Sequence, residues 1–150
     1  MKPCPHPLHS VLPHASPMIL LDAIDGYDDE EIRTHVRVSD ETPFMHNGQV
    51  PSYVGIEYMA QSIAAFQGLI ALESRKPVKV GFLLGTRKLT LACTSFDVAD
   101  LLNIEAKLLY SDGQVGSFDC RIVRGDDVVS TARLTVYEVQ DDLNNPKDNG

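Results

Sequence analysis

One apolar stretch of the sequence contains a single acidic residue, and that residue is the leading candidate for chemistry. From Ser52 to Leu72 the only charged side chain is Glu57. A carboxylate among apolar residues is costly to bury unless it has a partner or holds a proton, and burial raises its pKa. A carboxylic acid that keeps its proton near neutral pH can serve as a general acid. We therefore expect Glu57 to be a catalytic acid.

A histidine that precedes this acid could supply the complementary base. His46 stands eleven residues before Glu57, and a neutral imidazole titrates near physiological pH. One turn after Glu57, Gln61 could hydrogen-bond the carboxylate and fix its orientation. Backbone N–H groups over residues 52–54 could stabilise negative charge on a substrate oxygen. Two plainer alternatives remain: His46 is a loop residue without a role, or Glu57 is a structural acid satisfied by the backbone or by Gln61.

The element that must position these groups is a long helix predicted over residues 52–73. Pro51 precedes it, no proline interrupts it, and Ser52 is a suitable N-cap. At about 100° per residue, Tyr53 and Gln61 lie near the face of Glu57, where either could contact a ligand or simply pack. A helix that is apolar on nearly all sides is usually enclosed. Small residues beside the carboxylate predict close approach by another element: Ala60, Ala64, Gly68 and Ala71.

Segments of β character flank the helix on both sides. A run over 17–27 is expected to end at the turn Asp25-Gly26, and residues 31–38 alternate apolar and polar side chains. Four further strands are predicted after Lys76. The pattern indicates an α+β fold, with an antiparallel sheet wrapped around one long central helix. We expect a single domain over 1–150, with an irregular lead-in over 1–11 and a disordered tail over 140–150.

Composition excludes several classes of function. The net charge of -8 provides no excess of cations to bind a nucleic acid. Three cysteines are too few and too widely spaced for a disulfide framework or a zinc ribbon, and His6 and His9 lack further metal ligands. The N-terminus is rich in proline and lacks an apolar stretch, so no secretory signal is expected, and we find no apolar run long enough to span a membrane. These features predict a cytoplasmic protein that uses no metal.

Three stretches resemble the 3-hydroxyacyl-acyl carrier protein dehydratases, which have the hotdog fold. They are "LPHASPMILLD" at 12–22, with Leu12, Pro13, His14, Pro17 and Asp22 in the family's spacing, "PSYVGIEYMAQ" at 51–61, and "VADLLNIEAKL" at 98–108. The helix motif is the most specific. Within the family, "HNGQVP" at 46–51 and "GFLLGTRKL" at 81–89 are most similar to the dehydratases of aryl polyene gene clusters.

The resemblance implies roles for the residues singled out above. His46 would be the base and Glu57 the acid, with each site taking one residue from each subunit of a dimer. Ser52, Tyr53 and Gln61 would contact the substrate, Ser52 standing where the family has a glycine whose N–H polarises the thioester carbonyl. The substrate would be a 3-hydroxyacyl chain on the 4'-phosphopantetheine of an acyl carrier protein. The reaction needs no cofactor, and the dimer could pair identical chains or two different hotdog chains.

Two departures from the family pattern keep other functions open. In the general dehydratases the "GHFP" histidine stands farther before the helix carboxylate, and in "NGQVP" Gln49 occupies its place. Ala99 replaces a family glycine. The chain could therefore be a non-catalytic partner of another hotdog subunit, or a thioesterase whose helix acid activates water. Arg87 and Lys88 could meet a pantetheine phosphate or an acidic carrier protein, or simply form a solvated strand end.

Overall fold

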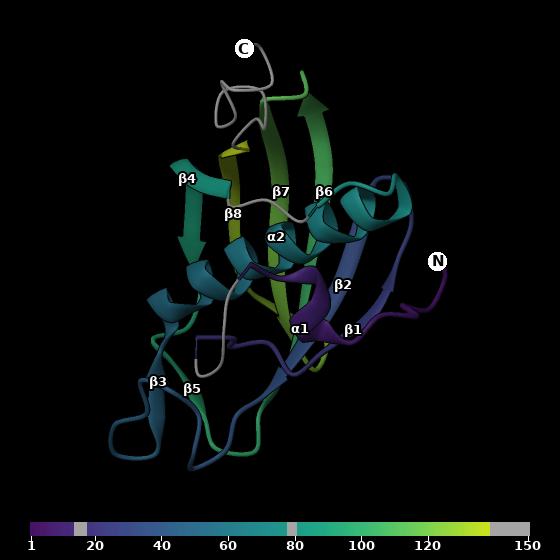
Figure 1. Cartoon of the computed structure of the whole chain (residues 1–150). Coiled ribbons are helices and arrows are strands. Elements are labelled where there is room, and N and C mark those ends of the chain that lie inside the picture. The colour runs from purple at the N-terminus through teal and green to yellow at the C-terminus, as the bar shows by residue number, and fades with distance from the viewer. Residues whose placement is uncertain (14–17, 78–80, 139–150) are drawn as a thin grey trace.

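One long helix lies against one face of an antiparallel sheet in the computed structural model, which describes residues 1–13, 18–77 and 81–138 (Figure 1). The helix is α2 (Gly55–Glu73). The sheet has six strands in the order β1-β2-β6-β7-β8-β4, and every pairing is antiparallel. Their bounds are β1 (Ala23–Tyr27), β2 (Glu31–Arg37), β4 (Gly81–Leu91), β6 (Leu101–Ser111), β7 (Val115–Arg124) and β8 (Asp127–Glu138). This is the hotdog arrangement, so the predicted α+β fold is confirmed.

A second, two-stranded sheet lies at the start of the helix. It pairs β3 (Gln49–Pro51) with β5 (Ser95–Asp97), and β3 leads directly into a 3₁₀ turn, η1 (Ser52–Val54). The predicted helix over 52–73 is therefore an α-helix only from Gly55 onward. Short strands of this kind carry too few alternating residues to be recognised from a sequence.

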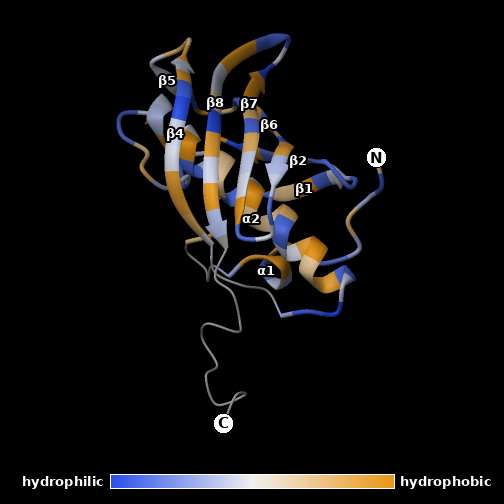
Figure 2. Cartoon of the chain, turned by 90° about the horizontal axis from the view of Figure 1, so that it is seen from above, coloured by the Kyte–Doolittle hydropathy of each residue, from blue (hydrophilic) through white to orange (hydrophobic). Residues whose placement is uncertain are grey.

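The core forms between α2 and the inner face of the sheet. In β2 the side chains of Ile32, Thr34 and Val36 are buried, as the alternation over 31–38 predicts. Phe66 of α2 meets Phe118 of β7 edge to face, with ring centroids 5.8 Å apart, a favourable geometry for aromatic pairs. Hydrophobic colour dominates α2 and recurs along the strands beside it (Figure 2).

The N-terminal lead-in is more ordered than predicted. Residues 8–11 form a one-turn helix, α1 (Leu8–Val11), and Lys2 forms a β-bridge with Tyr27. A Cβ placed on Gly68 would lie 1.8 Å from the carbonyl oxygen of Val11. The close approach predicted from the small residues of the helix is therefore made by α1 at Gly68, whereas Ala60 and Ala64, nearer to Glu57, border a groove. The predicted tail over 140–150 lies outside the described residues, as do His14 and Pro17.

The expected turn at Asp25-Gly26 is wrong. The register between β1 and β2 passes from Ile24 opposite Thr34 to Gly26 opposite Arg33, so Asp25 is the extra residue of a bulge. Its carboxylate lies 2.7 Å from Nδ1 of His35. The chain actually turns after β1, where Asp28 accepts hydrogen bonds from two backbone N–H groups. Pairing with β2 has overridden the local turn preference of the Asp-Gly pair.

Strand β4 is one edge of the large sheet, and every one of its residues is exposed. The helix packs mainly on β2, β6 and β7 and leaves the inner face of β4 uncovered. Among the described residues, no helix is long and apolar enough to cross a membrane.

Candidate active site

The candidate acid Glu57 lies in the first turn of α2, and its side chain is exposed. The expectation that this chain buries Glu57 among apolar residues is therefore wrong. The helix face that carries it turns away from the sheet and borders a shallow groove of about 260 Å³. This groove runs between α2 and the start of β4, and its walls include Glu57, Ala60, Ala64, Gln67, Leu83 and Val136.

Gln61 fixes one oxygen of this carboxylate, as predicted from its position one turn along the helix. Its side chain is 1% exposed, and its Nε2 lies 3.3 Å from Oε1 of Glu57. The same nitrogen donates to the carbonyl oxygen of Met18 at 2.7 Å, and Oε1 of Gln61 accepts from the N–H of Leu20 at 2.8 Å. The backbone N–H of Leu20 can only donate, so it must face the amide oxygen of Gln61. This sets the orientation of the Gln61 amide and directs its two N–H bonds to Met18 and Glu57.

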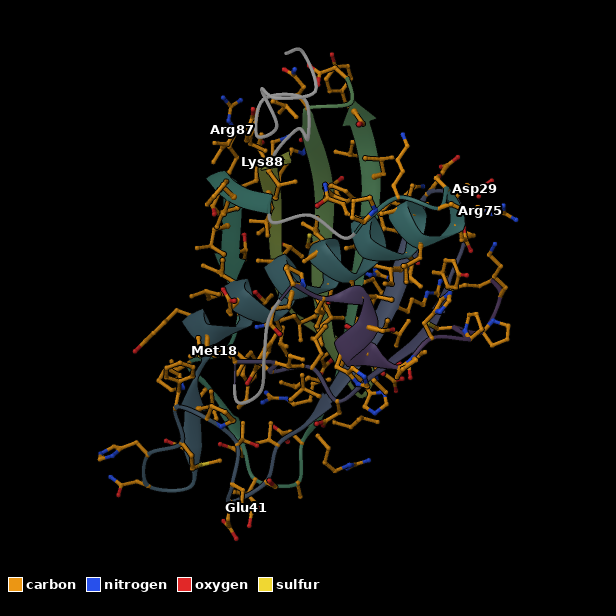
Figure 3. All side chains as sticks on the ribbon, in the orientation of Figure 1. Met18, Asp29, Glu41, Arg75, Arg87 and Lys88 are labelled. Carbon is orange, nitrogen blue, oxygen red and sulfur yellow. The ribbon has the colours of Figure 1, made fainter. Side chains whose placement is uncertain are left out.

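The segment that holds Gln61 belongs to one of the stretches that resemble the dehydratases. Met18 is exposed, and Figure 3 shows it near the N-terminal part of α2. No sequence pattern predicts that its backbone contacts the helix, because the two partners are about forty residues apart and the bonds use main-chain atoms. At the end of the stretch, Asp22 accepts a hydrogen bond from the backbone N–H of Arg37 at 2.6 Å, which ties the segment to β2.

His46 lies on a separate hairpin, away from Glu57. His46 and Gln49 exchange two backbone hydrogen bonds, of 2.8 and 3.1 Å. The two residues between them, Asn47 and Gly48, have φ values of 53° and 76°, which is the signature of a tight type I′ hairpin turn. The hairpin extends beyond β3 and away from the body of the helix (Figure 1). His46 is exposed and does not line the groove of Glu57.

The base of this hairpin is packed firmly onto the start of α2. Phe96 of β5 is fully buried, and its ring stacks on Tyr58 with centroids 6.2 Å apart. A Cβ on Gly55 would lie 2.6 Å from Ile122 and 3.3 Å from Phe96. Gly55 therefore lets the helix approach both side chains. This packing fixes the direction of the hairpin that carries His46.

Tyr58 follows Glu57 in the sequence and is buried together with its hydroxyl group. Its side chain is 1% exposed, and its buried hydroxyl has no hydrogen-bond partner among the residues that the structure describes. Desolvation, with a smaller effect from the Asp22 carboxylate, raises the pKa of Tyr58 to about 12. The phenol therefore stays neutral throughout the physiological range, and its ring packs on Phe96.

Ser52 and Tyr53 occupy the 3₁₀ turn before the helix. Ser52 is buried inside the 3₁₀ turn, the N-cap position of α2 is Val54, and the N–H of Ser52 donates to the carbonyl of Thr94 at 3.0 Å. The predicted N-cap role of Ser52 is therefore wrong. Because its N–H already donates to the Thr94 carbonyl, that N–H does not serve as an oxyanion donor in this structure. Tyr53 is 64% exposed. Its predicted contact with a substrate stays a prediction.

The loop after β5 contains the position at which Ala99 departs from the glycine of the family pattern. Ala99 has a φ of 79°, in the left-handed region that favours glycine. Asp100, which follows it, accepts from the N–H of Asp97 at 2.8 Å and from Arg124 at 3.0 Å. Hydrogen bonding to Asp100 raises the pKa of Arg124. The Asp of this motif therefore fastens β5 to the end of β7.

Comparison with known proteins finds relatives of known structure. The dehydratase heterocomplex ApeI:P from Xenorhabdus doucetiae contains a chain that is 31% identical, with 90% of this chain and 92% of that chain covered and a TM-score of 0.86. More distant structures share the fold alone. A hypothetical thioesterase from Streptococcus pneumoniae, solved with coenzyme A, is 15% identical with a TM-score of 0.59, covering 78% of this chain and 84% of that chain. The PaaI protein of E. coli is 12% identical with a TM-score of 0.61, covering 79% of each chain.

The sequence model of one protein family spans nearly the whole chain. It matches residues 6–147 and is described as ApeP-like, ApeP dehydratase. This match covers the helix with Glu57, the hairpin with His46 and all strands of the sheet. The chain belongs to the ApeP-like dehydratase family.

Proposed function

We propose that this chain dehydrates 3-hydroxyacyl thioesters carried by an acyl carrier protein, in the biosynthesis of aryl polyenes. The observation that carries the proposal is the placement of Glu57. It is the only charged side chain on the first four turns of α2, it borders a groove, and one of its oxygens is held by Gln61. Membership of a dehydratase family supports the same reaction class.

Glu57 supplies the proton that the leaving hydroxyl needs. Gln61 donates to Oε1 of Glu57, so Oε1 acts as an acceptor and the transferable proton resides on Oε2. As the C3–O bond breaks, Oε2 gives its proton to the hydroxyl, which departs as water. The electron pair of the C2–H bond forms the new C2–C3 double bond. General acid catalysis of this kind contributes about 10²–10⁴-fold.

His46 takes the C2 proton in the proposed site, and it does so in the site of the neighbouring chain. Within one chain His46 does not line the groove of Glu57. The groove of about 260 Å³ is also smaller than most small-molecule sites, which enclose about 300–1,000 Å³. A second hotdog chain that pairs with this one would cover the groove and bring in a histidine of its own. Covering it would also enclose Glu57 and exclude bulk water from the reacting groups.

The partner that this role requires is another hotdog chain. The related structure from Xenorhabdus doucetiae is a heterocomplex, and β4 offers an uncovered sheet edge here. We infer a two-chain assembly joined through that edge, with the thioester delivered by an acyl carrier protein. No step of the elimination requires a metal or an organic cofactor.

A second candidate function is that of a non-catalytic partner subunit. The exposed Glu57 and the distant His46 favour it, because neither residue completes a site within this chain. A third, thioester hydrolysis, would use Glu57 to activate water. Incubating the assembled protein with 3-hydroxyacyl and acyl thioesters distinguishes these functions. A dehydratase forms the 2-enoyl thioester, a thioesterase releases free thiol, and a non-catalytic subunit leaves activity unchanged when its Glu57 is replaced by Gln.

A further inference from the structure

Strand β4 is a free sheet edge of unusual composition. All its residues are exposed, the strand contains no proline, and no described helix covers it, so its protection as an edge rests on two bulges and on the charges of Arg87 and Lys88. Edge strands of globular proteins are normally short, charged or covered, because an open edge pairs with other chains. Its exposed large apolar side chains are Phe82, Leu83, Leu84, Leu89 and Leu91. Another strand is therefore expected to pair with it.

The charges on β4 are all positive. Arg87 and Lys88 follow the middle residue of the strand, Thr86, and the strand contains no Asp or Glu. Among the residues that the structure describes, neither cation has an ion pair. This concentration of positive charge lies at the edge of a chain whose net charge is -8.

Both cations occupy positions that are unfavourable in an isolated chain. Arg87 lies directly opposite Arg133 of β8, and the nearby carboxylate of Asp119 is already bonded to Arg133 at 2.9 Å. Like charges opposite each other destabilise a strand pair. Lys88 has a φ of 54°, within a bulge between Arg87 and Thr90. Bulges redirect side chains, and here Lys88 joins Arg133 on the outer face of the sheet.

We propose that Arg87 and Lys88 select the partner of β4, so that this edge pairs with a different hotdog chain carrying carboxylates there. The inference rests on the two-chain assembly of the proposed function and names what chooses its partner. Two copies paired about a two-fold axis at Thr86 would place their Arg87 side chains as diagonal neighbours, about 7–8 Å apart. The Arg87 and Lys88 side chains of both copies, four cations in all, would then gather on one face. A partner strand with Asp or Glu would instead neutralise Arg87 and Lys88.

The test exchanges charge between copies of this chain and needs no other protein. Arg87→Glu/Lys88→Glu is mixed in equal amounts with the wild type, and native mass spectrometry counts the dimers. The mixed dimer should exceed its statistical half share, because only it unites opposite charges. Exposed ion pairs contribute about 0.2–1 kcal/mol, so two of them should favour the mixed dimer by roughly 2–30-fold. In 0.5 M salt the preference should fall towards the statistical value, since screening acts within a few ångströms there.

A matched control makes the same charge change elsewhere. Figure 3 shows Arg75 at the far end of α2 from β4, so Arg75→Glu/Lys76→Glu should give a statistical mixture with the wild type. A statistical mixture for Arg87→Glu/Lys88→Glu, or no mixed dimer at all, would overturn the proposal. Binding of Arg87 and Lys88 to an acidic carrier protein would then be the alternative. Dehydration depends on Glu57 and is assayed separately, so failure of the pairing test and failure of the proposed function are distinguishable.

Discussion

The amide nitrogen of Gln61 lies 3.3 Å from Oε1 of Glu57, one helical turn away, and the same amide is anchored to the backbone of Met18 and Leu20. The orientation of the candidate acid is thus tied to a segment about forty residues earlier in the chain. Any change that loosens Gln61 should affect both the stability of the fold and the proposed proton transfer.

Replacing Gln61 by Leu should lower the free energy of unfolding by about 1–3 kcal/mol, because the Leu20 N–H and the Met18 carbonyl lose their buried partner. Urea denaturation followed by circular dichroism measures the change. Gln67→Leu is the matched control, since Gln67 makes no side-chain hydrogen bond to a described residue. Equal stability of the two variants would contradict the anchoring role of Gln61.

Gly68→Ala should be strongly destabilising, because the added Cβ would meet the Val11 carbonyl at 1.8 Å and main-chain atoms would have to move. Overpacking of this kind costs about 1–3 kcal/mol and occasionally more. Thermal unfolding provides the measurement. Gly85→Ala meets nothing within 4 Å and should leave the melting temperature nearly unchanged. A tolerated alanine at position 68 would show that α1 does not pack there.

Ala99→Gly should stabilise the fold, because the left-handed backbone at Ala99 costs an L-residue about 1–2 kcal/mol. Part of this gain is offset by the extra freedom of glycine in the unfolded chain. We expect a melting temperature higher by about 2–4 °C, on the scale of 1 kcal/mol for a chain of this size. Ala92→Gly, at a residue without positive φ, should lower it instead.

The hydrogen bond from the Tyr27 hydroxyl to Glu73, 2.5 Å long, should make stability depend on pH. It lowers the pKa of Glu73, with help from Lys2, and raises the pKa of Tyr27 to about 12. The lowered carboxyl pKa stabilises the fold above the ordinary Glu value, and this contribution is lost as pH falls through the folded-state pKa. The raised phenol pKa stabilises below pH 10, and this contribution is lost as pH rises towards 12.

Tyr27→Phe should therefore be less stable than the wild type by a constant margin between about pH 6 and 9. The margin should shrink in acid and again in alkali. Urea denaturation across this range measures it. A margin that does not change with pH would mean that packing of the ring, rather than the hydrogen bond, accounts for the effect of Tyr27.

The sequence predicted those features that depend on local periodicity. The alternation in β2 and the apolar run of α2 depend on near neighbours, and both are present. The pairing of β3 with β5 and the anchoring of Gln61 join residues more than forty positions apart, so no local pattern reveals them. The turn expected at Asp25 was wrong because the register with β2 decided that geometry. Burial of Glu57 was expected from its apolar neighbours in sequence, but this chain alone does not cover that face.

The role of Glu57 is tested most directly by the rate of dehydration of a 3-hydroxyacyl thioester on acyl carrier protein by the assembled Glu57→Gln variant. The substitution keeps the size of the side chain and its capacity to hydrogen-bond Gln61 but removes the transferable proton. We expect the rate to fall by about 10²–10⁴-fold with the melting temperature unchanged or slightly raised. His46→Ala should lower the rate to a comparable extent if its hairpin serves the neighbouring site. Dehydration at the wild-type rate by the Glu57→Gln assembly would contradict the assignment of Glu57 as the acid.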